Sequence, residues 1–220
     1  MMSRGLRPRL RVRRMEPTRC TWPGLSDPAY TLYHDTEWGV PQGDEVALFE
    51  KLILEGFQSG LSWLTILRKR DHFRAAFDGF DAEKIAGYGD HDVARLMADA
   101  GIVRNRLKIE GAILSAQAYL SLRDEQTLAD FLWGFAERPD GETRWASHGV
   151  VPAQTAVSIS MSKALKARGF RFVGPTTMYA LMQSVGMVND HLASCHRHGP
   201  CGKLQAKFLA ARGKAAGTRS

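Results

Sequence analysis

The amino-acid sequence predicts an all-α protein. Apolar residues recur at helical spacing through most of residues 44–185, and the alternating pattern typical of strands is almost absent. Glycine-containing turns separate these periodic runs, and there is no repeat of solenoid length. We therefore expect one domain built from helices.

The helices can be placed in order along the chain. Asp44 is a suitable N-cap for the first apolar run, and a second run extends from Leu61 through Phe77. Further helices are expected over residues 81–88, 90–100, 105–122 and 127–135. Residues 136–155 read as one long loop, which is followed by a helix ending near residue 169, a turn, and a helix from about Pro175 to Val185. The stretch from Cys20 to His34 has no helical period and is expected to be a loop.

Composition limits the class of protein. A chain of 220 residues with 44% apolar residues can bury an ordinary core without disulfides or oligomerisation, so we expect a monomer. Its three cysteines, an odd number, argue against a secreted disulfide framework and fit a reducing compartment. No apolar run approaches the ~18 residues of a membrane span. A soluble intracellular protein without a membrane partner is predicted.

The formal charge of +7 is concentrated at the two ends of the chain. Residues 1–15 hold six arginines and residues 203–220 hold five basic residues, with no acid in either stretch, which leaves 19 basic and 23 acidic residues between them. We expect disordered basic tails at 1–16 and 201–220 around a domain at 17–200. Such tails either attract nucleic acid without sequence preference or only keep the protein soluble.

Four soft metal ligands stand near the two ends of the domain. Cys20 and His34 lie in the front segment, and His191 and Cys195 are four residues apart near the back, which on a helix would place both on one face. Cysteine and neutral histidine are ligands that Zn²⁺ prefers, and four protein ligands would make a structural site without an open position. The alternative is a set of buried free cysteines and hydrogen-bonded core histidines. Three nearby donors could compete for a metal: His196, His198 and Cys201.

The turn before the last predicted helix is a candidate phosphate site. Gly169 can end one helix, and Gly174 allows close approach of a partner where the next helix begins at Pro175. The amides of Gly174 and Thr176 would then form a helix N-terminus suited to an anion such as a nucleic-acid phosphate. An ordinary helical hairpin with a solvated basic face is the alternative.

A carboxylate among aromatic residues indicates a pocket. Glu55 ends an apolar helix beside Phe57 and Trp63, and the flanking glycines at 56 and 60 permit a concave surface. The front segment adds a dense aromatic set, and such a surface suits a flat, electron-poor or cationic heterocycle. A tryptophan-rich core with a capping glutamate is the alternative. The additional aromatic residues are Trp22, Tyr30, Tyr33 and Trp38.

Five motifs occur in one collinear order between about residues 19 and 195. They are CTW at 20–22, YHDTEWGVP at 33–41, LEGFQSGLSW at 54–63, RGFRFVG at 168–174, and VNDH at 188–191 with Cys195. Together they closely resemble the 3-methyladenine DNA glycosylase I family. The tails and residues 136–155 carry no part of this resemblance.

The resemblance implies a helix-hairpin-helix fold, a structural zinc, and removal of N3-methyladenine from alkylated double-stranded DNA. It also implies a bacterial cytoplasmic protein that associates with the nucleoid through DNA. The zinc would join the N- and C-terminal segments and be held by Cys20, His34, His191 and Cys195. The extruded base would lie among Trp22, Tyr33, Trp38 and Trp63, with Glu55 accepting hydrogen bonds from its amino edge. The DNA contacts would be Gly60 and Leu61 as the wedge, with Arg171, Phe172, Gly174 and Thr176 at the phosphate.

Two further inferences concern the reaction. Asp190 directly precedes a metal ligand, so we expect it to support or cap the structure and not to act on the sugar. No lysine is expected among the pocket residues, which predicts a monofunctional glycosylase without a Schiff-base lyase step. Two other classes stay open: a non-enzymatic zinc-stabilised helix-hairpin-helix DNA-binding module, and a zinc-dependent hydrolase with an open metal position.

Overall fold

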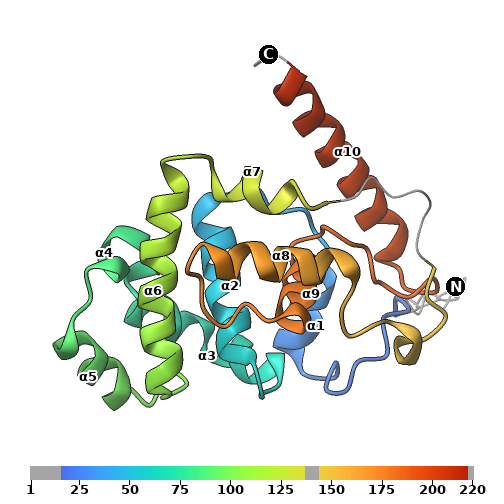
Figure 1. Cartoon of the computed structure of the whole chain (residues 1–220). Helices are drawn as coiled ribbons and strands as arrows, with labels where there is room; N and C mark the ends of the chain where they lie inside the picture. The colour runs from blue at the N-terminus through green and yellow to red at the C-terminus, as the bar shows by residue number, and fades with distance from the viewer. Residues whose placement is uncertain (1–15, 137–143, 218–220) are drawn as a thin grey trace, which may run out of the picture.

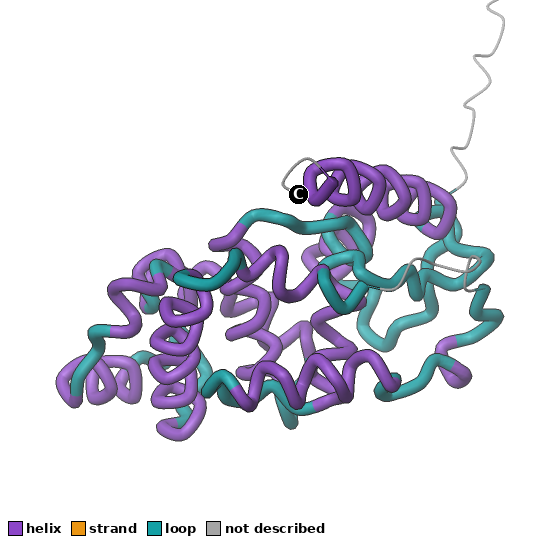
Figure 2. The backbone as a smooth tube through the Cα atoms, turned by 45° about the horizontal axis from the view of Figure 1, so that its top comes forward, coloured by secondary structure: helices purple, strands orange, loops and turns teal. Residues whose placement is uncertain are grey.

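The computed structural model describes residues 16–136 and 144–217. Every regular element within these ranges is a helix, so the predicted all-α class is confirmed (Figure 2). None of the described helices is both long enough and apolar enough to cross a membrane. The α-helices are α1 (Pro28–Thr36), α2 (Glu45–Gln58), α3 (Trp63–Ala76), α4 (Ala82–Ala86), α5 (Asp90–Ala98), α6 (Arg106–Arg123), α7 (Leu128–Trp133), α8 (Ala156–Ala167), α9 (Pro175–Ser184) and α10 (His198–Gly217), with short 3₁₀ turns at Asp78–Phe80 and His148–Val150.

Short polar residues determine where most helices begin. Asp44 accepts a hydrogen bond from the amide of Ala47 at 2.9 Å, and Ser62 accepts one from Thr65 at 3.2 Å. Such side chains satisfy amides that have no partner inside the helix, and each stabilises its helix by about 1 kcal/mol. The same role is played by Asp27, Asp81, Asn105, Thr127 and Thr155.

Helix α2 is the centre of the fold. Leu48, Phe49, Leu52, Leu54 and Phe57 are each at most 1% exposed, so the helix is buried on several sides. Helices α3, α6, α7 and α9 pack around it (Figure 1). A charged side chain near the end of this helix therefore lies inside the protein.

Two local predictions were wrong in the front and back segments. The stretch from Cys20 to His34 is not all loop, because α1 begins at Pro28 after the Asp27 cap. Only two residues of α1 are buried, so no apolar period reveals it. Conversely, residues 191–195 form turns and not a helix, and the amide of Cys195 donates to the Leu192 carbonyl at 2.8 Å.

The predicted disorder of residues 201–220 was also wrong for the part that the structure describes. Residues 198–217 form α10, whose Cys201 is fully buried and whose Phe208 ring lies 4.5 Å from that of Trp133. These tertiary contacts order a segment whose basic composition favours a tail. Beyond Arg212, which forms an ion pair with Asp130 of α7, the C-terminal end of α10 projects away from the other helices (Figure 1). The predicted tail at 1–16 falls almost wholly outside the described residues.

Candidate active site and metal-ligand cluster

The aromatic residues of the predicted pocket lie together. Trp22 packs edge-on against Trp38 with ring centroids 4.6 Å apart, and Tyr33 lies 5.4 Å from Trp63. Tyr30 joins these two groups, at 5.2 Å from Trp22 and 6.3 Å from Tyr33. Helix α1 and its flanking turns thus meet the start of α3. The structure brings all four predicted base-pocket residues into one cluster, to which Tyr30 is added.

Glu55 is a buried carboxylate beside this cluster. It is 3% exposed, and its Oε2 atom has no hydrogen-bond partner within the described part of the chain. Burial raises the pKa of Glu55 to about 7. The charge of Lys51 and a hydrogen bond with the Ser184 hydroxyl oppose that rise. The indole Nε1 of Trp63 is likewise buried without a partner. An unsatisfied acceptor and an unsatisfied donor beside aromatic rings are typical of a ligand site.

A lysine does lie at this pocket, contrary to the sequence-based expectation. Lys51 Nζ is 3.4 Å from the Tyr33 hydroxyl oxygen, 4.6 Å from the Tyr33 ring centroid and 5.0 Å from that of Trp63. Lys51 precedes Glu55 by four residues on α2, and that spacing places both on one helix face. The four-residue spacing between Lys51 and Glu55 is the sequence signal that could have identified Lys51 as a pocket residue.

The four predicted metal ligands form a buried cluster. The ligand atoms of Cys20, His34, His191 and Cys195 all lie within 4.8 Å of one another, and all four residues are buried. Cys195 Sγ is 3.5 Å from His34 Nε2 and 3.5 Å from His191 Nδ1, and Cys20 Sγ is 3.5 Å from His191 Nδ1. Ligands about 2.0–2.3 Å from a tetrahedral ion would stand roughly 3.6 Å apart, so the donors match the size of such a site.

Neighbouring acceptors fix the orientation of both imidazoles. His34 Nδ1 lies 2.7 Å from Asp35 Oδ1, and His191 Nε2 lies 3.1 Å from the Trp38 carbonyl oxygen. If each of these nitrogens carries the proton, His34 Nε2 and His191 Nδ1 present lone pairs to the cluster, as metal-binding histidines do. His196 and His198 do not belong to the cluster, and Cys201 Sγ lies 4.0 Å from the Trp38 carbonyl oxygen.

A hydrogen bond from the Cys20 thiol to Cys195 perturbs the pKa of both thiols. The pKa of Cys195 lies far below its ordinary value because the Cys20 thiol donates a hydrogen bond to it, with further support from His191 and His34. The pKa of Cys20 is raised by the same hydrogen bond and by burial. A cation at this position would stabilise both thiolates and release the proton of the Cys20 thiol.

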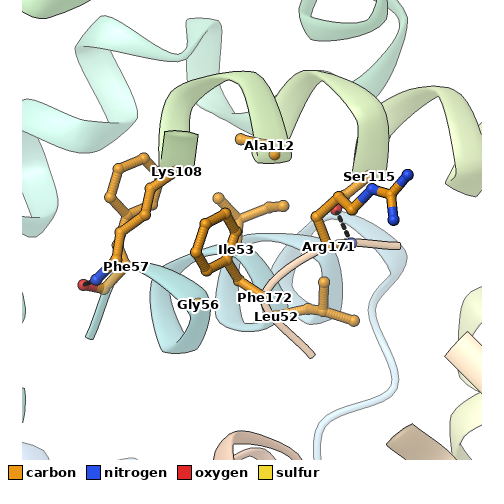
Figure 3. Close-up of a pocket in the computed structure, with 10 residues that line it drawn as sticks. Leu52, Ile53, Gly56, Phe57, Lys108, Ala112, Ser115, Arg171 and Phe172 are labelled. Atoms are coloured by element: carbon orange, nitrogen blue, oxygen red, sulfur yellow. Dashed lines mark hydrogen bonds between the residues drawn. The ribbon is translucent and has the colours of Figure 1, made fainter. Parts of the chain in front are cut away.

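The hairpin between α8 and α9 packs tightly on the helical core. Ser162 Oγ donates to the Val173 carbonyl at 2.6 Å, and the Arg171 amide donates to Ser115 Oγ at 3.0 Å. Phe172 adopts a φ of 56°, is 37% exposed, and places its ring between α2 and α6 at the edge of a shallow pocket (Figure 3). The Arg171 and Thr176 side chains are exposed, and Gly174 caps α9. The predicted phosphate contacts therefore lie on one surface turn.

A lysine of α6 holds the loop between α2 and α3 by hydrogen bonds. Lys108 Nζ donates to the carbonyl oxygens of Phe57 at 2.8 Å and Ser59 at 2.6 Å. Gly60 has a φ of 83° with open space around it, and Leu61 is 43% exposed. The two predicted wedge residues thus stand on the surface at the end of α2, a few residues beyond Glu55.

Asp190 is held by three donors. Its carboxylate accepts hydrogen bonds from Trp145 Nε1 at 2.8 Å, Tyr179 Oη at 2.7 Å and Gln183 Nε2 at 2.8 Å. The residue is 3% exposed. These bonds tie the segment before His191 to α9, which agrees with a structural role.

These features define a class of protein. The chain is an all-helical protein with a buried aromatic and carboxylate pocket and a Cys/His cluster made by its front and back segments. A family model described as methyladenine glycosylase matches residues 22–198. The chain belongs to this family.

Known proteins with similar sequences and structures support this membership. DNA-3-methyladenine glycosylase 1 of Escherichia coli (strain K12) is 47% identical over 178 residues, which cover 80% of this chain and 95% of that protein. DNA-3-methyladenine glycosylase of Haemophilus influenzae is 45% identical over 185 residues, which cover 84% and 97%. A crystal structure of 3-methyladenine DNA glycosylase I matches with a TM-score of 0.79 and 46% identity over 82% of this chain and all of the other. A variant of such an enzyme in complex with 3-methyladenine matches with a TM-score of 0.75 and 35% identity over 78% and 93%.

Proposed function

We propose that this protein is a DNA-3-methyladenine glycosylase, a hydrolase that cleaves the N-glycosidic bond of N3-methyladenine in alkylated DNA. The observation that carries the proposal is the pair of unsatisfied polar atoms in the pocket, Glu55 Oε2 and Trp63 Nε1. The amino edge of an adenine offers N–H donors beside a ring-nitrogen acceptor, which matches this pair. Relatives that cover most of the chain carry the same activity in their names.

The chemistry required of the pocket is modest. N3-methyladenine is formally cationic in the nucleotide, so its glycosidic bond is weak and the base is a good leaving group. Stacking on Trp22, Tyr33, Trp38 and Trp63 and hydrogen bonding to the charged Glu55 would select this base over neutral purines. No lysine-dependent lyase step is needed for release of the base, so we propose a monofunctional enzyme.

The substrate is proposed to be double-stranded DNA with the damaged nucleotide turned out of the stack. Extrusion costs a few kcal/mol, and less for a damaged base. Gly60 and Leu61, which stand exposed at the end of α2, would fill the gap in the duplex. Arg171, Gly174 and Thr176 would hold a phosphate at the N-terminus of α9, and Phe172 supports that turn.

We propose that Cys20, His34, His191 and Cys195 hold one structural Zn²⁺. The support is the match in donor type, spacing and imidazole orientation. A zinc bound there joins α1 to the segment after α9, and both neighbour the pocket. Four protein ligands leave no position for a reacting water, so the metal would stabilise the fold.

Release of the damaged base tests the proposed function. DNA treated with a methylating agent is incubated with the purified protein, and liberated bases are separated by chromatography. N3-methyladenine should appear in proportion to enzyme, and untreated DNA should yield nothing. Binding of DNA without release of any base would instead favour the non-enzymatic DNA-binding module, for which the buried pocket has no role.

A further inference from the structure

Lys51 lies at the base pocket with one weak hydrogen bond to hold it. Its Nζ contacts the Tyr33 hydroxyl at 3.4 Å and stands over the rings of Tyr33 and Trp63. An ammonium over aromatic faces is attracted by their electron density, by about 0.5–2 kcal/mol. The half-buried Lys51 side chain therefore places its ammonium against the rings of Tyr33 and Trp63.

The charges around Lys51 pair in a way that leaves Glu55 as its partner. Arg70 donates to both carboxylate oxygens of Glu37, at 2.5 and 2.9 Å. Arg74 donates to both oxygens of Glu50, at 2.8–3.1 Å. Of the charged groups near Lys51, these four neutralise one another at hydrogen-bond distance. Among the described residues of this region, Lys51 and Glu55, one turn apart on α2, are the cation and the anion without such a bond to an opposite charge.

Burial acts on both members of this pair. It lowers the pKa of Lys51 to about 8, and the charges of Glu55 and Glu37 oppose the change. It raises the pKa of Glu55 to about 7, and the charge of Lys51 opposes that change. Each charge therefore favours ionisation of the other.

We propose that Lys51 is a positioning residue for base excision: its ammonium is the counter-ion that keeps the Glu55 carboxylate ionised and able to accept hydrogen bonds from the damaged base. The inference rests on the proposed function of the pocket. Lys51 acts through Glu55 and does not touch the base itself. Without this cation, only the hydrogen bond of the Ser184 hydroxyl opposes the effect of burial, and the Glu55 carboxyl takes up a proton near neutral pH.

The other titratable groups that face this pair do not change charge near neutrality. The tyrosine hydroxyls of α1 have pKa values raised by burial. The ion pair between the end of α1 and α3 lowers the pKa of its carboxyl and raises the pKa of its guanidinium, so both pKa values move away from neutral pH. His148 lies at the Trp22 ring, with centroids 6.2 Å apart, so it is the difference between the pH profiles of the wild-type protein and a Lys51 variant that reports Glu55 and Lys51. The hydroxyls are those of Tyr30 and Tyr33, and the ion pair is that of Glu37 with Arg70.

The test compares pH profiles of single-turnover excision for the wild-type protein, Lys51→Met and Lys51→Arg. Methionine keeps the length of the side chain and removes the charge. The acidic limb of the profile should move to a pH about 1–3 higher in Lys51→Met, because an opposite charge within about 4–6 Å lowers a carboxyl pKa by that amount and the substitution removes it. The rate should recover at alkaline pH, and Lys51→Arg should keep the wild-type limb. Lys84→Met is the matched control, since Lys84 is 62% exposed on α4.

Each outcome decides one question. An unchanged acidic limb in Lys51→Met, or a loss that alkaline pH does not restore, overturns the role of Lys51. Absence of base release by the wild-type protein would instead refute the proposed function. Titration of Glu55 by NMR of carbon-labelled glutamate gives a readout independent of activity, with Glu55→Gln identifying the signal. If Lys51→Met does not fold, Lys51→Gln removes the same charge with a polar side chain.

Discussion

Gly186 lies against the backbone of Val40 with no room for a side chain. A Cβ atom at residue 186 would come within 2.7 Å of the Val40 carbonyl carbon and 2.6 Å of the Pro41 nitrogen. Gly186 also has a φ of 73°, which L-residues rarely adopt. The adjacent Gln42 amide donates to the Val185 carbonyl at 3.1 Å. This contact fastens the end of α9 to the segment that carries Trp38.

Gly186→Ala should destabilise the fold markedly. The left-handed backbone conformation lowers the unfolding free energy of an alanine variant by about 1–2 kcal/mol. The clash lowers it by about 1–3 kcal/mol more, because the backbone atoms of Val40 and Pro41 cannot rotate away as a side chain could. Gly79→Ala is the matched control, since Gly79 has a φ of 69° with nothing within 4 Å. Denaturant unfolding of both variants separates strain from clash. Equal losses of unfolding free energy would contradict the close contact seen at Val40.

Cys195→Ser should remove the metal and lower stability. Cys195 Sγ contacts both ligand nitrogens, so its loss opens the cluster that joins the two ends of the domain. The zinc content measured by elemental analysis should fall from one ion per chain to near zero, and the melting temperature should be lower than that of the wild-type protein. Cys201→Ser is the control, because Cys201 is buried but outside the cluster. Full zinc content in Cys195→Ser would disprove the assignment of this ligand.

The sequence predicts best where a helix buries a periodic face. Helix α2 was expected from its apolar run, because Leu48, Phe49 and Leu52 lie on buried faces. Helix α1 was missed because only Tyr33 and His34 of that helix are buried. Helix α10 was expected to be a tail, since its order depends on tertiary contacts such as that of Phe208 with Trp133, which local composition does not encode.

The candidate site shows the same division. The membership of the aromatic cluster followed from the resemblance, but its geometry depends on how α1 and α3 meet. Lys51 shares a helix face with Glu55, yet a charged residue in a helix usually faces solvent. Only the packing of α1 and α3 shows that Lys51 is partly covered, by Tyr33 and Trp63. Pairing of Glu37 with Arg70 and of Glu50 with Arg74 is equally a matter of tertiary structure.

Glu55→Gln should slow excision of N3-methyladenine about tenfold or more. The amide keeps the shape of the side chain but loses a charge-assisted hydrogen bond to the base, which is worth about 1.5–3 kcal/mol. Single-turnover assays on methylated DNA measure this loss, and affinity for undamaged DNA should barely change. Glu83→Gln serves as control, since Glu83 is 67% exposed on α4. Wild-type rates in Glu55→Gln would show that the carboxylate is only structural.

The same substitution should stabilise the protein at alkaline pH. A carboxyl whose folded-state pKa is about 7, above its ordinary 4.5, favours the protonated form in the fold. Its ionisation therefore destabilises the native state as pH rises from about 4.5 to 7, by about 3 kcal/mol in total. Melting temperatures of the wild-type protein and Glu55→Gln should agree near pH 4.5, and the variant should melt higher at pH 8. A constant difference across this range would contradict the raised pKa.

Arg171→Ala should weaken DNA binding without altering the pocket. The Arg171 side chain is exposed on the hairpin turn, whereas its backbone amide is held by Ser115 Oγ, so the turn should keep its shape. Loss of one phosphate contact lowers the slope of log affinity against log salt by about one. Binding to undamaged duplex at several salt concentrations measures that slope, with Arg123→Ala as a charge-matched control because Arg123 pairs with Glu83 at 2.9 Å. Excision at saturating enzyme should stay near the wild-type rate, since Arg171 does not line the Glu55 pocket. An unchanged salt slope in Arg171→Ala would place the phosphate contact on another part of the surface.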